Sequence, residues 1–98
     1  MINTITCKPH TALGILAICN FYADNNCHNV LSDDTARRMI KTVVEGLKLG
    51  DDTTCSITLD DVTCEDLHML LSYYARTVPI NDDGLHDVIG QLFKTLKY

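Results

Sequence analysis

The chain contains two similar segments, and this internal repeat constrains the fold more than any other feature of the sequence. Residues 3–24 align with residues 55–76 at an offset of 52, and residues 32–49 align with residues 81–98 at an offset of 49. Each alignment has five identical positions, and the same order of alternating stretch, helix start, apolar helix face and second helix start recurs. A repeat of this length is one supersecondary unit that cannot bury its apolar face without a second copy.

Each copy opens with a stretch in which apolar and polar residues alternate, within residues 1–7 and 54–59. Period-two alternation with β-branched residues is typical of a half-buried strand. The apolar face holds Ile5, Cys7, Ile57 and Leu59, and the opposite face holds Thr4, Thr6, Ser56 and Thr58. Because each strand has one apolar face, we expect the two strands to pair as a two-stranded antiparallel ribbon.

Two helices are expected after each strand. The first runs to about Ala23 or Arg76, with a capping box at Thr63 and its counterpart Thr11. The second begins after Ser32 or Asn81, and Gly50 stands where a C-terminal cap is expected. The apolar stripes of the second helices are Met39, Ile40, Val43, Val44 and Leu47, and Leu85, Val88, Ile89, Leu92, Phe93 and Leu96.

The predicted fold is therefore mainly α with a two-stranded antiparallel ribbon, built from a duplicated β-α-α unit. The repeats, residues 1–50 and 54–98, are joined by a turn too short to separate them. We expect them to share one core as a single domain over residues 1–98.

Composition narrows the classes of function. The net charge is −5, and eleven of the thirteen acidic residues are Asp. An acidic chain is poorly suited to nucleic acid or an anionic membrane, because neutralising phosphates requires Lys and Arg. The sequence has no long uncharged apolar span. The run Leu16–Cys19 resembles a lipoprotein cleavage box only weakly, because Ile18 is too large for its position. We expect a cytoplasmic protein.

The pattern resembles the ribbon-helix-helix family of the Arc, MetJ and CopG class, in two tandem copies. The resemblance lies in Ser56–Leu59, in the helix Asp66–Ala75, and in Asn81–Asp83 at the start of the last helix. It implies that the ribbon enters the DNA major groove and that the N-termini of the second helices bind phosphates. The implied base-reading residues are Thr4, Thr6, Lys8, Ser56, Thr58 and Asp60, and the implied phosphate-binding amides lie near Ser32 and Asn81.

The charges depart from that family's pattern. The ribbon face has one lysine and no arginine, and Asp60 and Asp61 follow the second strand. Both second helices open with paired aspartates. Their fixed negative charges lie at the positive N-terminal end of the helix dipole, where a phosphate would dock. DNA binding is therefore disfavoured by charge, and a sequence-specific transcriptional repressor is kept as an alternative.

Metal and cofactor sites are not expected. Cys7 with His10, Cys27 with His28 and Cys64 with His68 invite a zinc interpretation, but none matches a paired Cys-x-x-Cys site. The repeat places Cys7, Cys19 and Cys64 at positions typical of a core. A small zinc protein is the second alternative, and the role of Cys27 and His28 stays open. The aspartate pairs lack the spacing of a calcium loop. An acidic surface is expected from Asp33, Asp34, Asp60, Asp61, Asp82 and Asp83.

The two copies differ on the outer face of the first helix. Leu13, Leu16 and Ala17 in the first copy correspond to Glu65, His68 and Met69 in the second. This difference predicts an apolar patch for self-association or for a partner protein. The alternative is that residues 24–31 cover the patch.

Function is expected to reside in binding rather than in chemistry. The sequence has no activated-nucleophile motif, phosphate loop or metal triad, so an enzyme is not expected. The interpretation is a small non-enzymatic intracellular regulator that binds an unidentified protein through the helix patch or the acidic surface. A small acidic chain of this kind would suit an inhibitor encoded by a phage or mobile element.

Overall fold

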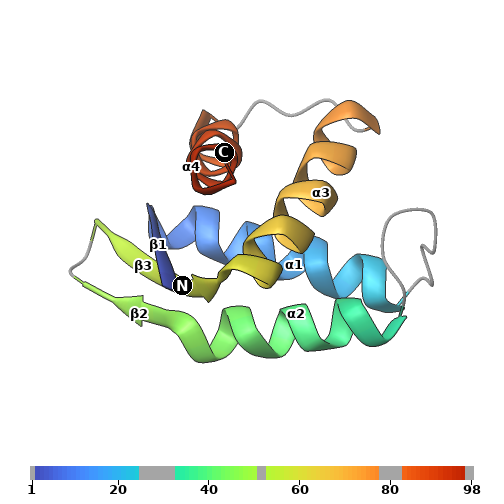
Figure 1. The fold of residues 1–98 in the computed structure, drawn as a ribbon. Coiled ribbons are helices and arrows are strands. Elements are labelled where there is room, and N and C mark those ends of the chain that lie inside the picture. The colour runs from blue at the N-terminus through green and yellow to red at the C-terminus, as the bar shows by residue number, and fades with distance from the viewer. Residues whose placement is uncertain (1, 25–32, 51–52, 78–82, 97–98) are drawn as a thin grey trace.

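A computed structural model describes residues 2–24, 33–50, 53–77 and 83–96 of the 98-residue chain (Figure 1). These residues form mainly helices with a small antiparallel sheet, as expected from the periodicity. The elements in chain order are β1 (Ile2–Cys7), α1 (Pro9–Asp24), α2 (Asp33–Gly46), β2 (Leu47–Leu49), β3 (Cys55–Asp60), α3 (Asp61–Thr77) and α4 (Asp83–Thr95).

The sheet has the strand order β1-β3-β2, with both pairings antiparallel. β1 and β3 face each other from Ile2 opposite Asp60 to Cys7 opposite Cys55, which confirms that these two strands pair. The expectation of a two-stranded ribbon is wrong, because β2 adds a third strand along the other edge of β3. An unpaired strand edge presents free N–H and C=O groups, and the chain leaving α2 satisfies those of β3.

The end of α2 explains the third strand. A Cβ added at Gly46 would overlap the backbone carbonyl of Thr58, so only glycine allows the end of α2 to lie this close to β3. Leu47 leaves the helix there and enters β2, although we expected it on the helix stripe. Gly50 is not the C-terminal cap, because its N–H donates to the carbonyl of Thr54 at 3.0 Å and helps close the β2–β3 turn.

The starts of α1 and α3 differ from the predicted capping box. α1 begins at Pro9, a residue favoured at the first helical position, and the carbonyl of Lys8 accepts the first helical hydrogen bonds. At α3 the cap is Asp60, whose Oδ1 accepts a hydrogen bond of 2.7 Å from the N–H of Thr63. Thr11 and Thr63 are buried inside the first turns, so the capping box predicted there is wrong. Ser32 and Asn81, the other predicted caps, lie outside the described residues.

The buried side chains form one cluster to which both halves of the chain contribute. α2 packs against β3 and α4 packs against β1, so the second helix of each half covers the strand of the other half. The apolar stripes are narrower than predicted, because Val44 and Phe93 are more than half exposed. The largest fully buried side chains include Ile5, Ile15, Met39, Val43, Ile57, Leu59, Leu67, Leu70, Leu71, Val88 and Leu92.

Candidate functional site

The outward face of the β1–β3 pair gathers four hydroxyl side chains. Thr4 lies opposite Thr58, and Thr6 lies opposite Ser56. Both β1 residues are exposed and both β3 residues are half-buried, so the predicted alternation of the two faces is confirmed. Lys8 lies beyond the end of β1, where it lines a groove.

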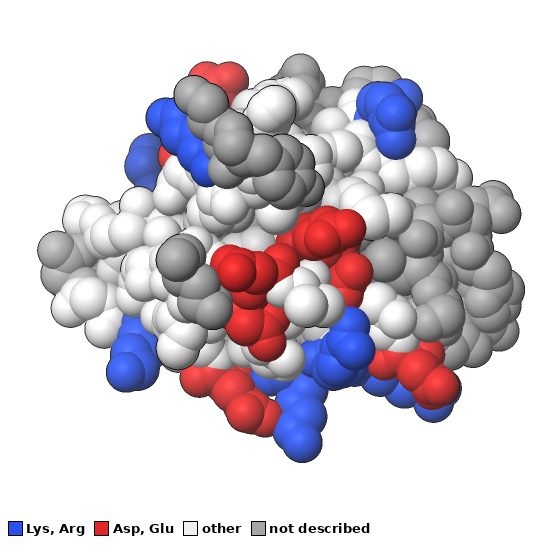
Figure 2. Space-filling model, in the orientation of Figure 1, with Lys and Arg blue, Asp and Glu red and all other residues white. Residues whose placement is uncertain are grey.

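Carboxylates surround the passage from β3 into α3. Asp60, Asp61 and Glu65 are exposed, and Figure 2 shows acidic side chains gathered there. The hydrogen bonds from the hydroxyl and N–H of Thr63 lower the pKa of Asp60, because they favour the ionised carboxylate. Asn3 on β1 donates to Oδ1 of Asp61 at 2.7 Å. Any ligand of the hydroxyl face therefore meets negative charge at this end of the sheet.

The remaining predicted acidic residues lie at the starts of the second helices. Asp34 in α2 and Asp83 in α4 are exposed. The side chain of Asp33 and the whole of Asp82 lie outside the description.

An apolar stripe runs along the outward face of α1. Leu13 is 67% exposed and Phe21 is 55% exposed, with exposed Ala17 between them at helical spacing. Leu16 is instead half-buried and packs against the core, so only part of the predicted patch reaches the surface. Phe21 extends the stripe, and sequence comparison missed it because the aligned residue of the second copy, Tyr73, is also aromatic. Residues 25–31, the predicted alternative cover, are not described.

A shallow groove borders this stripe. It has a volume of about 320 Å³ and is lined by Ala17, Ile18, Phe21, Tyr22 and Tyr74. Between Pro9 and Ala23 the sequence has no Asp, Glu, Lys or Arg. This part of the surface is therefore apolar and uncharged on a chain whose net charge is −5.

The corresponding face of α3 is of a different kind. Glu65 is exposed and Met69 is 44% exposed. Asp66 forms an ion pair with Arg38 of α2, with 3.0 Å between Oδ2 and Nη2. In the alignment of the two segments, α3 thus carries the charged Glu65 where α1 carries Leu13.

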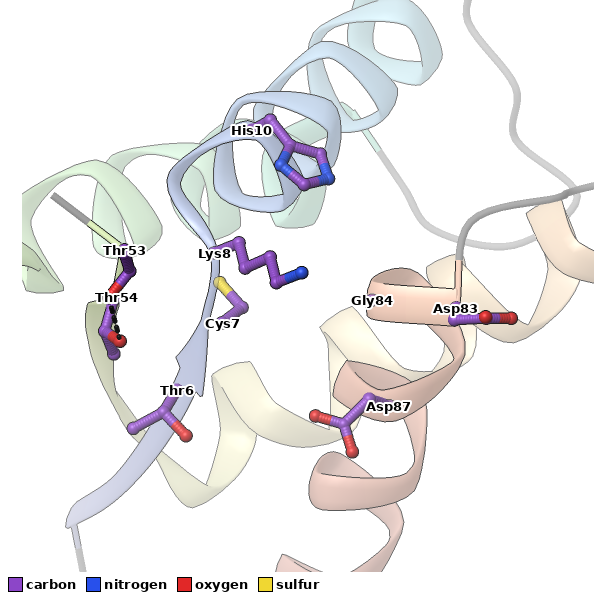
Figure 3. A pocket seen from close by; sticks show the side chains of 9 residues that line it. All are labelled: Thr6, Cys7, Lys8, His10, Thr53, Thr54, Asp83, Gly84 and Asp87. Atoms are coloured by element: carbon purple, nitrogen blue, oxygen red, sulfur yellow. Dashed lines mark hydrogen bonds between the residues drawn. The ribbon is translucent and has the colours of Figure 1, made fainter.

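A larger open groove lies where β1 ends (Figure 3). Its volume is about 810 Å³, and the end of β1, the start of α1, the β2–β3 turn and the start of α4 surround it. Lys8 and His10 contribute from one side, and Asp83 and Asp87 from α4. The full lining is Thr6, Cys7, Lys8, His10, Thr53, Thr54, Asp83, Gly84 and Asp87.

Gln91 of α4 secures the strand beside this groove. Its Nε2 donates to the carbonyl of Thr6 at 2.7 Å, and its Oε1 accepts from the N–H of Thr6 at 2.9 Å. Nε2 also donates to Asp87 at 2.8 Å. One side chain therefore satisfies both backbone groups of a residue on the outer edge of β1.

Two thiols meet beside the same groove. Cys7 and Cys55 are opposite each other in the register, with 3.7 Å between their Sγ atoms. Burial and, to a smaller extent, the neighbouring Cys55 raise the pKa of Cys7 to about 12. Cys7 is half-buried, which corrects the expectation of a core position, whereas Cys19 and Cys64 are buried as predicted.

Among the described residues, Cys64 and His68 differ in burial. Cys64 is fully buried, while His68 is half-buried, and its ring lies edge-on to that of Phe93 with 5.9 Å between the ring centroids. With Arg76 and His86, His68 lines a groove of about 540 Å³ between α3 and α4. Within the described ranges, no group of three or more His, Cys, Asp or Glu side chains is placed to hold a metal ion. Cys27 and His28 fall outside those ranges.

Besides Phe21, sequence comparison missed the Cys7–Cys55 pair and the contacts of Gln91. The repeat aligns Cys7 with Leu59, but antiparallel pairing brings it opposite Cys55, at the other end of the equivalent strand. The pair could have been found from the antiparallel direction of the two strands, but not from the alignment of the two segments. The alignment did not indicate the role of Gln91 either. The aligned residue, Thr42, makes a different contact, because its hydroxyl donates a hydrogen bond to the carbonyl of Arg38 in the same helix.

No helix in the described part of the chain is long and apolar enough to cross a membrane. Comparisons of this chain with protein-family models, with curated proteins and with solved structures found no match.

Proposed function

We propose that this chain is a small non-enzymatic regulatory protein that binds another protein through the outward face of α1. The observation that carries the proposal is the exposure of Leu13, Ala17 and Phe21 along one uncharged helix face. Single exposed apolar residues are common, but a contiguous stripe of them marks an interaction surface. Covering it gains about 25 cal/mol for each Å² of apolar area removed from water.

The bordering groove gives the surface a shape as well as an apolar character. An aromatic anchor beside a concavity is typical of the residues that dominate binding energy. Phe21 is such an anchor, and the groove formed with Tyr22 and Tyr74 accepts a side chain of the partner. The carboxylates near Asp60 lie where β3 passes into α3 rather than on α1. Their charge would influence which partner binds and how fast it associates.

The test adds one charge to the stripe. Leu13→Glu and Phe21→Glu are expected to weaken capture of the partner at least tenfold without unfolding the chain, because both side chains are mostly exposed. Val44→Glu is the matched control, since Val44 is 54% exposed on another helix. Partners retained by the wild type and the control but lost by both α1 variants support the proposal. Equal retention by every variant would exclude this face.

The same experiment addresses self-association. Sedimentation equilibrium of each variant measures the solution mass of the chain. A wild-type dimer that becomes a monomer with Leu13→Glu, and not with Val44→Glu, would identify the partner as a second copy.

The alternative function is a DNA-binding repressor of the tandem ribbon-helix-helix type. What supports it is the strand register: residues aligned by the offset of 52, Ile5 and Ile57, lie directly opposite each other. Such pairing is what a two-fold axis between two copies of one unit requires. It also brings the hydroxyl of Thr4 to the same face as that of Thr58.

Two observations weigh against that alternative. The third strand adds about 4.8 Å to the width of the sheet, and a major groove about 12 Å wide admits a two-stranded ribbon. Asp60 and Asp61 also place negative charge beside the hydroxyl face.

DNA selection at low and physiological salt separates the two functions. An enriched motif that is lost when Thr6→Val and Thr58→Val remove two hydroxyls would support the repressor. The absence of any enriched motif would leave protein binding as the function.

A further inference from the structure

We propose that Cys7 and Cys55 are a covalent modification site, which a small-molecule disulfide such as oxidised glutathione converts to a disulfide bond between β1 and β3. Cys7 is the thiol that reacts first, and Cys55 is the thiol that completes the bond. This inference is independent of the proposed binding function.

The register places the two cysteines within bonding reach. Residues opposite each other on antiparallel strands have Cα atoms about 4.5–5.5 Å apart, and disulfides span Cα distances of about 4.4–6.8 Å. The Sγ atoms already lie 3.7 Å apart, and the thiol of Cys55 also lies 3.5 Å from the carbonyl oxygen of Cys7. Rotation about the Cα–Cβ bonds is therefore sufficient, and the strands need not separate.

Access distinguishes the two thiols. Cys7 is half-buried and lines the open groove at the end of β1 (Figure 3). Cys55 is fully buried. The ammonium of Lys8 in the same groove attracts a carboxylate-bearing reagent, and Asp83 and Asp87 across the groove oppose it. A small disulfide can therefore reach Cys7 but not its partner.

The chemistry balances in two exchange steps. The thiolate of Cys7 first attacks one sulfur of the small disulfide, forming a mixed disulfide and releasing one small thiolate, which takes up a proton. The sulfur of Cys55 loses its proton and attacks the Cys7 sulfur of the mixed disulfide, which releases the second small thiolate. The protein loses two hydrogens, and the reagent is reduced to two thiols.

The surroundings set the rate. Because burial keeps the thiol of Cys7 protonated at neutral pH, its thiolate fraction and the rate of the first step rise about tenfold per pH unit below its pKa. Among the described residues, the charged or titratable groups around the thiol, besides Cys55, are Lys8, His10, Asp83 and Asp87. The site therefore responds to prolonged oxidising conditions rather than to brief ones.

The experiment uses the folded full-length chain and oxidised glutathione at mildly alkaline pH. Aliquots are quenched with N-ethylmaleimide in denaturant, so that buried thiols also react, and are weighed intact by mass spectrometry. The wild type is expected to lose two hydrogens and to bind two fewer maleimides than the reduced protein. Cys27→Ser is the control, and it should form the same disulfide.

The single variants identify the order of reaction. Cys55→Ser is expected to accumulate one glutathione adduct on Cys7, because no second thiol completes the exchange. Cys7→Ser should gain neither the adduct nor the disulfide on the same timescale. Circular dichroism checks that each variant is folded, and Cys55→Ala replaces Cys55→Ser if the buried hydroxyl unfolds the chain.

Several outcomes would overturn the proposal. They are formation of the two-hydrogen-lighter species in Cys7→Ser, its loss in Cys27→Ser, or its absence from the wild type when an exposed cysteine peptide in the same buffer is fully oxidised.

Discussion

At the scale of single residues, Gly46 fixes how closely the end of α2 approaches the sheet. We expect Gly46→Ala to destabilise the fold by about 2 kcal/mol, because the new Cβ would overlap the rigid backbone of Thr58. Gly90→Ala in α4 is the matched control, since a Cβ there meets nothing within 4 Å. The control should gain about 0.5–1 kcal/mol from lower backbone entropy in the unfolded chain. Urea unfolding midpoints measure both changes, and equal effects would contradict the close approach.

Thr11 and its aligned counterpart Thr63 have different surroundings. Thr11 and Thr63 are both buried, yet only Thr63 hydrogen-bonds through its hydroxyl to Asp60. Among the described residues, the Thr11 hydroxyl has no hydrogen-bond partner. Thr11→Val should therefore be neutral or stabilising, whereas Thr63→Val should cost about 1 kcal/mol. Thermal melts of the two variants test this, and a larger loss for Thr11→Val would show that its hydroxyl is satisfied.

At the scale of elements, the start of α3 makes stability depend on pH. Its cap Asp60 has a pKa lowered below 3.8 in the folded chain, so the cap stabilises the fold above that value. This contribution is lost as the pH falls through the folded pKa. Asp60→Asn keeps the capping oxygen without the charge, so we expect it to melt below the wild type at neutral pH. The difference should shrink toward zero in acid.

Melting curves recorded from neutral pH down into acid measure this difference. Glu65→Gln is the control, because it removes one negative charge from α3 without touching the cap. A difference between the wild type and Asp60→Asn that does not change with pH would rule out the ionised cap as its source.

At the scale of the whole molecule, each half covers the strand of the other. Because α2 packs on β3 and α4 packs on β1, neither half can bury its own strand fully. We expect fragments 1–50 and 53–98 to lack a cooperative melting transition when separate, and to regain helical circular dichroism and cooperativity when mixed. A cooperative transition in either isolated fragment at low concentration would contradict this mutual dependence.

Particular residues show how much of the fold could be predicted from the sequence. Alternation around Ile5 and Ile57 predicted the strands and their buried faces, because period two leaves one face for the core. The first helix of each half was also predicted from the sequence. The observed ends of α1 at Asp24 and of α3 at Thr77 lie one residue beyond the expected positions. Leu47 was misplaced because an apolar residue fits a helix stripe and an edge strand equally well.

The candidate sites were predictable only in part. Leu13 stood out because the aligned residue is Glu65, a contrast visible in the sequence. The role of Gln91 was not visible, because it depends on α4 lying beside the edge of β1. Distances between residues far apart in the chain have no local signal. The contacts of Gln91 and the pairing of Cys7 with Cys55 both depend on such distances.

The sequence by itself determined the periodicity of the predicted elements, the order of the strands and helices apart from β2, and the acidic net charge. These follow from the local chemistry of each side chain, which acts over a few residues. The tertiary structure alone decided that the chain after α2 joins the sheet, that Phe21 stays exposed, and that Cys7 meets Cys55. Those outcomes depend on how the halves pack, because packing brings together groups far apart in the chain, such as Cys7 and Cys55, which are 48 positions apart.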